Sequence, residues 1–333
     1  MNSKNELSVF HVRSSQAVIS AGYRLFMGNF RKLLRRTWLF GIIYALVVGV
    51  LMRVWLQLMP QLLVMASNPS AYDMTGTTMA AMGASSFLIL VLMLGCWAAW
   101  LLFYAPAVSM LGEHQATGVV AMPAKWFSKP DWHMMLRLLK LCLWLWAIGL
   151  IASFVIGLLL GLGQTMAHPS MRLLGATGVL LCLIAAALLM PLVYTAYKYL
   201  LTPGSSFQKV LSTSYPTALR HWGSIFLVGL MVYIVTFLLS AIVLLPYYIL
   251  TAALTTAQLG VLGGDPMGMP DYMSWMSLVV FTISGFILGY LSLSTLFPFY
   301  YLYGSITKQE DELTEMRNQK LTSNNEKTKD SVH

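Results

Sequence analysis

The residues of this chain that could do chemistry beside a membrane are one carboxylate and three histidines. Glu113 and His114 are adjacent, and His133 and His221 lie at comparable depth next to other apolar segments. Histidine titrates near neutral pH and can carry a proton or bind a metal ion, and a carboxylate can act with it. These four residues could form an interfacial polar site that binds a metal or a phosphate headgroup. The alternative is four polar residues at a membrane surface without a common function.

No other catalytic or cofactor pattern is present in the sequence. It contains no His-Glu-x-x-His zinc motif, no Walker-type phosphate loop and no dinucleotide-binding fingerprint. Cys96, Cys142 and Cys182 stand singly in apolar segments, which is typical of small buried hydrophobic residues. We therefore predict no catalytic residue, no cofactor and no metal site. If the protein is an enzyme, Glu113, His114 and His221 are its only candidates.

Methionine is frequent, with 22 residues, and part of it gathers in two connections between apolar segments. Thioethers are soft ligands suited to Cu(I). Since neither Cys nor His accompanies them, we favour flexible apolar packing over copper binding. The methionines concerned are Met65, Met74, Met79, Met82, Met267, Met269, Met273 and Met276.

The composition predicts an all-α polytopic membrane protein. Hydrophobic residues make up 58% of the chain and charged residues 10%, whereas about 25% of an ordinary soluble domain is charged. About 20 apolar residues in a helix cross the roughly 30 Å hydrocarbon core of a bilayer. Six segments qualify as spans: Thr37–Met59, Ser86–Met110, Leu141–Leu162, Leu173–Tyr194, Ser224–Leu250 and Leu278–Tyr303.

The positive charges predict the orientation of these spans. Nineteen of the 21 Lys and Arg residues fall in the two terminal segments and in the connections after the second and fourth spans, and only Arg53 and Arg172 fall elsewhere. Because cytoplasmic loops carry an excess of Lys and Arg, both termini are expected in the cytoplasm. The net charge of +9 does not indicate a nucleic-acid partner, since the cations are dispersed beside membrane spans and anionic lipid headgroups already account for them.

The segment before the first span reads as an amphipathic helix. Apolar residues at spacings of three and four form one face, and cations lie on another. We expect this helix to lie in the cytoplasmic interface, with its cations on anionic lipid headgroups; the alternative is a solvated cytoplasmic helix. The apolar face is Ile19, Tyr23, Phe26, Phe30 and Leu33, and the lipid-facing basic patch is Arg24, Arg31, Lys32, Arg35 and Arg36.

The six spans are arranged as three hairpins, each preceded by a basic amphipathic stretch. The second stretch opens with Ser128 and Asp131, a side-chain cap and an acid in a first helical turn. Each returning span ends near a proline with aromatic residues, and such prolines are expected to kink the helix. The domains expected are a cytoplasmic segment 1–15, a transmembrane domain 16–306 and a charged cytoplasmic tail 307–333. In the tail, a capping-box pattern at 307–310 predicts a short helix to about Lys320, with disorder over 321–333.

Residues 16–308 resemble the six-helix membrane domain of some bacterial glycerophosphodiester phosphodiesterases and its stand-alone relatives of unassigned role. The resemblance rests on the entry pattern from Tyr23 to Phe30, echoed from Tyr215 to Trp222, on the Ser/Thr-rich approach 205–214, and on the exit Pro298–Tyr301. The soluble catalytic domain of those enzymes is absent, so the resemblance implies no enzyme activity. It implies a multi-pass protein of the bacterial cytoplasmic membrane.

Two functions from different classes remain. The first is a non-enzymatic membrane module that engages anionic lipid headgroups or a membrane-protein partner, which the basic stretches and the lack of ionisable residues within the spans favour. The second is a transporter or exporter of an amphiphilic solute that needs no ion-coupling carboxylate. In a transporter, polar residues of the last two spans should line one cavity, namely Thr236, Ser240, Thr282, Ser284 and Ser292.

Overall fold

The computed structural model describes residues 9–67, 76–120, 128–165, 180–262 without 181 and 186, 264, and 270–330. Over this part of the chain the protein consists of helices joined by short connections. They are α2 (Ser15–Ser67), α3 (Gly76–Thr117), α4 (Lys129–Thr165), α6 (Leu192–Leu201), α7 (Phe207–Arg220), α8 (Trp222–Val243), α9 (Leu245–Leu262), α10 (Asp271–Ser294) and α11 (Leu296–Asp330).

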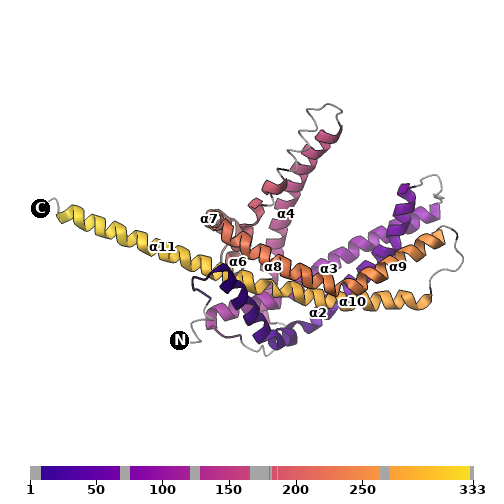
Figure 1. Ribbon diagram of the computed structural model, residues 1–333, viewed down its shortest axis with the longest axis horizontal. Helices are drawn as coiled ribbons and strands as arrows, with labels where there is room; N and C mark the ends of the chain where they lie inside the picture. The colour runs from indigo at the N-terminus through magenta and orange to yellow at the C-terminus, as the bar shows by residue number, and fades with distance from the viewer. Residues whose placement is uncertain are drawn as a thin grey trace.

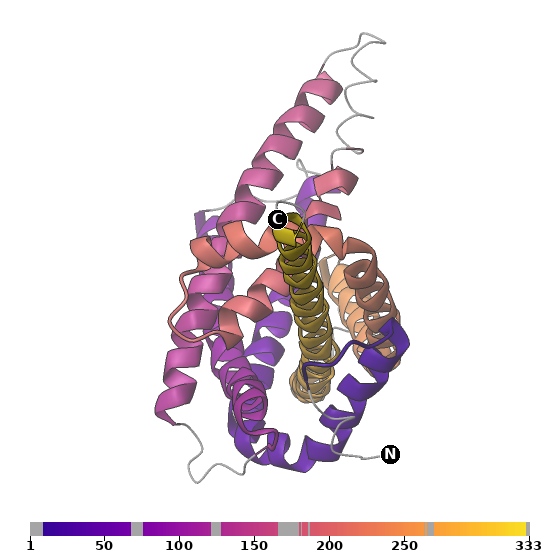
Figure 2. The same ribbon diagram turned by 90° about the vertical axis from the view of Figure 1, so that its left-hand side faces the viewer.

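The predicted fold class, an all-α membrane helix bundle, is confirmed. Within the described residues, six helical stretches are long and apolar enough to cross a membrane. Helices α2, α3, α8, α9 and α10 run side by side, and α4 leans away from them in both Figure 1 and Figure 2. The fourth stretch is Cys182–Leu201; the predicted span Leu173–Tyr194 lies partly outside the described residues.

The three returning spans meet in one aromatic core at one end of the bundle. Phe103 of α3, Tyr194 of α6 and Tyr300 of α11 are all buried in the same cluster. The rings of Tyr194 and Tyr303 lie 5.7 Å apart. The aromatic residues that end each hairpin in the sequence therefore hold the hairpins to one another.

Prolines coincide with three breaks in the helices. Pro191 is the N-cap residue of α6, Pro246 is the second residue of α9, and Pro298 is the third residue of α11. A proline lacks the amide donor that an interior helical position needs, but the first turn does not need it. The predicted spans Ser224–Leu250 and Leu278–Tyr303 are consequently each divided, at Leu244 and Thr295.

Helices continue through two places where the sequence changes character, and the helix start predicted at Thr307 is wrong. The amphipathic entry segment and the first span form one continuous helix, α2, of 53 residues. The tail does not begin a new helix at Thr307, since α11 runs unbroken to Asp330 and Thr307 Oγ1 donates to the carbonyl of Tyr303 at 2.8 Å. Residues 321–330 are thus helical, and 331–333 lie outside the described residues.

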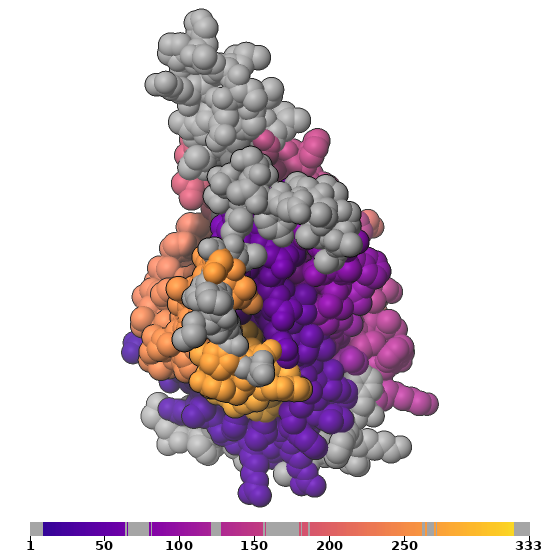
Figure 3. Space-filling view, turned by 90° about the vertical axis from the view of Figure 1, so that its right-hand side faces the viewer, coloured from indigo at the N-terminus to yellow at the C-terminus, as the bar shows by residue number. Residues whose placement is uncertain are grey.

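Small residues bring α2 and α10 close together. Gly41, Ala45 and Gly49 recur every four residues on α2, and Gly285 and Gly289 face them from α10. A Cβ atom at Gly49 would lie 2.4 Å from Thr282 Oγ1, and one at Gly289 would lie 3.2 Å from the Phe103 ring. Small residues spaced by four allow close approach of membrane helices. Figure 3 views the end of the bundle where the orange helices α9 and α10 lie beside the violet part of α2.

Gly22 and Gly28 of α2 form a matched pair for testing this close packing. A Cβ atom at Gly22 would lie 2.4 Å from the Pro298 backbone nitrogen of α11, whereas a Cβ atom at Gly28 meets nothing within 4 Å. We expect Gly22→Ala to lower the free energy of unfolding by about 1–3 kcal/mol, because two backbones must separate. Gly28→Ala should leave the free energy unchanged or raise it by up to about 1 kcal/mol. Unfolding in mixed micelles measures both, and equal effects would contradict this packing.

Candidate functional site

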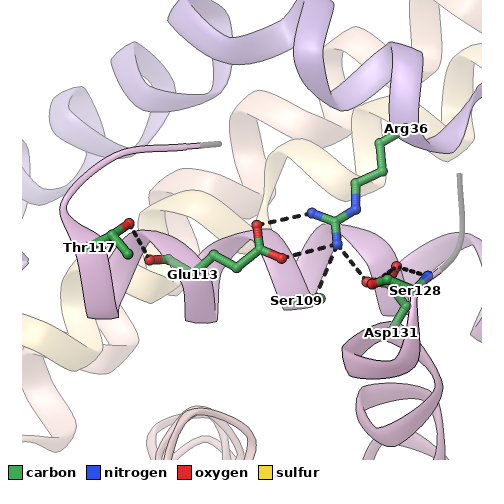
Figure 4. Close-up of polar contacts among 6 residues, drawn as sticks. All are labelled: Arg36, Ser109, Glu113, Thr117, Ser128 and Asp131. Carbon is green, nitrogen blue, oxygen red and sulfur yellow. Dashed lines mark hydrogen bonds and ion pairs between the residues drawn. The ribbon is translucent and has the colours of Figure 1, made fainter. Parts of the chain in front are cut away.

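The basic segment of α2 contributes its last cation, Arg36, to the interior of the protein. Arg36 is only 2% exposed, although the sequence predicts it among the lipid-facing residues, so that prediction is wrong for this residue. Its Nη2 atom lies 2.7 Å from Asp131 Oδ1, and its Nη1 and Nη2 atoms donate to the two Glu113 carboxylate oxygens, each at 3.2 Å. Figure 4 shows how α2, α3 and α4 each supply one charged group.

The carboxylates of this cluster are themselves held in place. Asp131 is fully buried, in the first turn of α4. Its Oδ2 atom accepts from both the backbone nitrogen and the hydroxyl of Ser128, each at 2.9 Å, so the start of α4 is held by the acid that the sequence predicts in its first turn. Ser109 Oγ accepts from Arg36 at 3.4 Å. We call these five residues the buried charge cluster: Arg36, Ser109, Glu113, Ser128 and Asp131.

The cluster connects three helices through opposite charges rather than preparing a reaction. The Arg36 guanidinium binds Glu113 with both terminal nitrogens, a geometry that fixes orientation as well as distance. Both carboxylates are hydrogen-bonded to this one buried cation. The geometry therefore indicates a structural clasp at the end of the bundle.

Sequence reasoning overlooked this cluster, but a signal for it exists. Between residues 37 and 306, Glu113 and Asp131 are the only acids in segments that the charge pattern assigns to the cytoplasmic side. Two isolated acids beside an excess of cations are expected to form an ion pair with one of those cations. The sequence does not predict which cation pairs with these acids, since five cations lie within thirteen positions of α2.

The four residues of the predicted polar site do not come together. Glu113 turns to Arg36, while the ring of His114, which is 3% exposed, lies with its Nδ1 atom 3.0 Å from the Tyr300 hydroxyl. His221 pairs with Glu310 of α11 at 3.0 Å, and His133 is exposed on α4. Glu113 and His114 are adjacent in the sequence but contact different helices. His114 and His221 both form contacts with α11.

Within the described part of the chain, no group of three or more His, Cys, Asp or Glu residues is placed to hold a metal ion. The predicted methionine groups lie partly beyond it: Met74, Met267 and Met269 are outside the described residues, and no side chain of Met79 is described.

The remaining cations of the basic segment 24–36 of α2 divide between two environments. Lys32 Nζ donates to the carbonyl of Val120 at 2.8 Å and so ties the connection after α3 to α2. Arg24, Arg31 and Arg35 are exposed on a neighbouring face of the helix. Six exposed residues follow one another at helical spacing, and we call them the exposed stripe: Arg24, Met27, Gly28, Arg31, Arg35 and Trp38.

The apolar face of the same helix packs on protein. Phe26 lies edge to face on Phe297 with ring centroids 5.2 Å apart, and Phe30 lies on Tyr290 at 5.9 Å. Leu33 is 1% exposed. Phe26 and Phe30 of this apolar face are therefore covered by α11 and α10.

A polar recess lies at the other end of α2. Arg53 donates to Ser274 Oγ at 2.6 Å, and its guanidinium lies 5.9 Å from the Trp275 ring centroid. A cavity of about 60 Å³ beside Arg53 adjoins a wider hollow of about 380 Å³, and Gln57 and Gln258 line both. The buried Oε1 atom of Gln258 has no hydrogen-bond partner. None of the five polar residues expected to line a transport cavity lines this recess.

Comparison with known proteins identifies no relative of this chain. No protein-family model matches the chain, and neither a curated protein nor a solved structure is found to be similar to it. The family resemblance therefore stays a prediction, and the chain is established as a multi-pass membrane protein from its own six apolar helical stretches.

Proposed function

We propose that this protein is a non-enzymatic membrane module that engages anionic lipid headgroups on the cytoplasmic side of a bacterial cytoplasmic membrane. The observation that carries the proposal is the exposed stripe of α2, where Arg24, Arg31 and Arg35 lie on one face with Met27 and Trp38. Cations beside a membrane attract anionic lipid, and an indole ring one turn from Arg35 anchors the helix in the interface.

The internal contacts of α2 support this proposal. Lys32 and Arg36 are committed to the protein, through the Val120 carbonyl and the buried carboxylates. The opposite face of α2 packs on α10 and α11. The stripe is thereby held on a rigid helix with its cations directed outward, and cytoplasmic placement follows from the charge asymmetry of the sequence.

Neutralising two cations of the stripe tests the proposal. In Arg31→Gln/Arg35→Gln, the affinity of the purified protein for phosphatidylglycerol should fall about 30-fold, because each cation contributes on the order of 1 kcal/mol. Native mass spectrometry of the protein in maltoside detergent, titrated with phosphatidylglycerol, measures the change. Phosphatidylcholine binding should be unaffected.

The control variant is Arg317→Gln/Lys320→Gln, which removes the same charge from the exposed outer part of α11. Its affinity for phosphatidylglycerol should stay within a factor of about three of the unmodified protein. If both double variants lose affinity equally, net charge and not the stripe is responsible, and the proposal fails.

Transport of an amphiphilic solute is the second candidate. The polar recess around Arg53 favours it, since an arginine within a membrane-spanning helix with an unpartnered buried amide nearby is typical of a ligand contact. Transport through this recess does not require lipid binding by the exposed stripe. It gains support if phosphatidylglycerol binding is indifferent to Arg31 and Arg35.

A further inference from the structure

Four helices line the polar recess at the end of α2 that lies away from the exposed stripe. Arg53 and Gln57 come from α2, Gln258 from α9 and Ser274 from α10, and Ser85 of α3 lines the wider part. Figure 3 faces this end of the bundle, where α9 and α10 lie beside α2. The exposed stripe and the buried charge cluster contribute no residue to the recess.

Arg53 is a cation whose surroundings in the recess contain no described carboxylate. None of the described residues that line either cavity is Asp or Glu. Arg53 donates to Ser274 Oγ through Nη2 at 2.6 Å, and its guanidinium carries further N–H donors. The residue is only partly buried, so these donors are within reach of a ligand. An arginine in a membrane-spanning stretch is costly and is almost always paired, which favours an anion at this position.

The small cavity beside Arg53 limits the size of this anion. Its volume is about 60 Å³, which is room for about two water molecules at roughly 30 Å³ each. A carboxylate group fits this space, and its planar shape matches the planar guanidinium. Leu56 and Leu254 form the apolar part of the lining. The cavity therefore favours a carboxylate over a bulkier anionic group.

The wider hollow is lined by uncharged hydrogen-bonding groups. Its volume of about 380 Å³ is typical of a site for a small molecule. The polar lining consists of Gln57, Gln61, Ser85 and Gln258. An amide group both donates and accepts hydrogen bonds, as a hydroxyl group does, so several hydroxyl groups match this lining. Gln57 follows Arg53 by one helical turn, about 6 Å along α2, so a short ligand can contact both side chains.

We propose that the recess binds a hydroxylated carboxylate, such as a sugar acid, from the side of the membrane opposite to the exposed stripe. The carboxylate binds Arg53 in the small cavity, and the hydroxyl groups exchange hydrogen bonds with Gln57 and its neighbours in the wider hollow. The Trp275 ring, 5.9 Å from the guanidinium, stabilises the cation from another side. This site goes beyond the proposed function and shares no residue with the exposed stripe, so either can fail without the other.

Calorimetry on the full-length protein in maltoside detergent tests this site with three soluble probes. Gluconate carries a carboxylate and hydroxyl groups, sorbitol carries hydroxyl groups alone, and acetate carries a carboxylate alone. Gluconate should bind saturably, and sorbitol and acetate should each bind at least about tenfold more weakly, because each lacks one of the two recognised groups. Absence of saturable gluconate binding overturns the inference, and so does equal affinity for all three probes.

Variants tie the binding to this recess. Arg53→Gln should weaken gluconate binding at least about tenfold and remove its advantage over sorbitol, since the charge-assisted hydrogen bonds are lost. Gln57→Leu, at an exposed position, should weaken gluconate binding and leave the affinity for acetate unchanged. General damage to the fold would weaken both. The control Arg31→Gln/Arg35→Gln should bind gluconate normally, and gluconate affinity that neither Arg53→Gln nor Gln57→Leu changes overturns the assignment.

Discussion

Replacing Arg36 with alanine is expected to lower the free energy of unfolding by about 3–5 kcal/mol, because it leaves two carboxylates near the protein interior without their cation. Asp131 is fully buried and has Ser128 as its other partner, while Glu113 is partly exposed. Most of the loss should therefore come from Asp131. Unfolding of the purified protein in mixed micelles, followed by tryptophan fluorescence, measures the difference.

Two further variants separate the charge cluster from general damage to α2. Arg35→Ala, at the exposed neighbouring position, should change the free energy by less than about 0.5 kcal/mol. The triple variant Arg36→Met/Glu113→Gln/Asp131→Asn removes all three charges together and should recover more than half of the loss, since no buried charge is left unpaired. If the triple variant is as unstable as Arg36→Ala, the cluster does not stabilise the protein in this way.

The basic segment shows how far the sequence alone could predict this site. Its periodicity correctly separates an apolar face, which includes Phe26 and Leu33, from a basic face, which includes Arg31 and Arg35. It could not predict which face meets lipid, because lipid tails and the interior of a membrane protein are equally apolar. Only the position of α10 and α11 decides this, and those helices are more than 200 residues away in the chain.

The helix boundaries illustrate a second limit. Pro191, Pro246 and Pro298 each lie at a helix start, whereas Pro60, Pro106 and Pro216 lie inside helices that continue through them. A proline therefore marks an interruption at some positions only. The capping-box pattern that starts at Thr307 predicts a helix start that does not occur, because the same side chain can donate to the carbonyl four residues earlier in a continuous helix. A local capping signal is overruled where the preceding turn is already helical and packed.

Packing between helices was the least predictable part of the structure. The small residues Gly285 and Gly289 have the spacing of a helix-packing motif in membranes. Their partner helix is not readable from one sequence, since the chain contains 25 glycines. The contact of Gly289 with Phe103 arises only where α2, α3 and α10 meet.

Phe103→Ala is the second variant for which we expect a large effect, about 3 kcal/mol in the free energy of unfolding. The Phe103 side chain is 0% exposed. Its ring stacks on Tyr44 with centroids 5.8 Å apart and lies edge to face on Tyr290 at 5.2 Å. Two of its close neighbours, Gly41 and Gly289, have no side chain that could fill the space left by the ring. The substitution should therefore open a cavity that the surroundings cannot close.

The expected loss of stability in Phe103→Ala depends on the lipid or detergent that surrounds the protein. In water, a buried Phe→Ala change costs about 3–5 kcal/mol, of which one part is the transfer of the ring and the other is the cavity. Lipid is as apolar as the core, so the transfer part shrinks, and the lower end of the range applies. Phe87→Ala is the matched control on the same helix: its side chain is 68% exposed, and lipid or detergent can fill the vacated space. Mixed-micelle unfolding should show a change below about 0.5 kcal/mol for Phe87→Ala, and similar losses at both positions would mean that the aromatic core does not hold the three hairpins together.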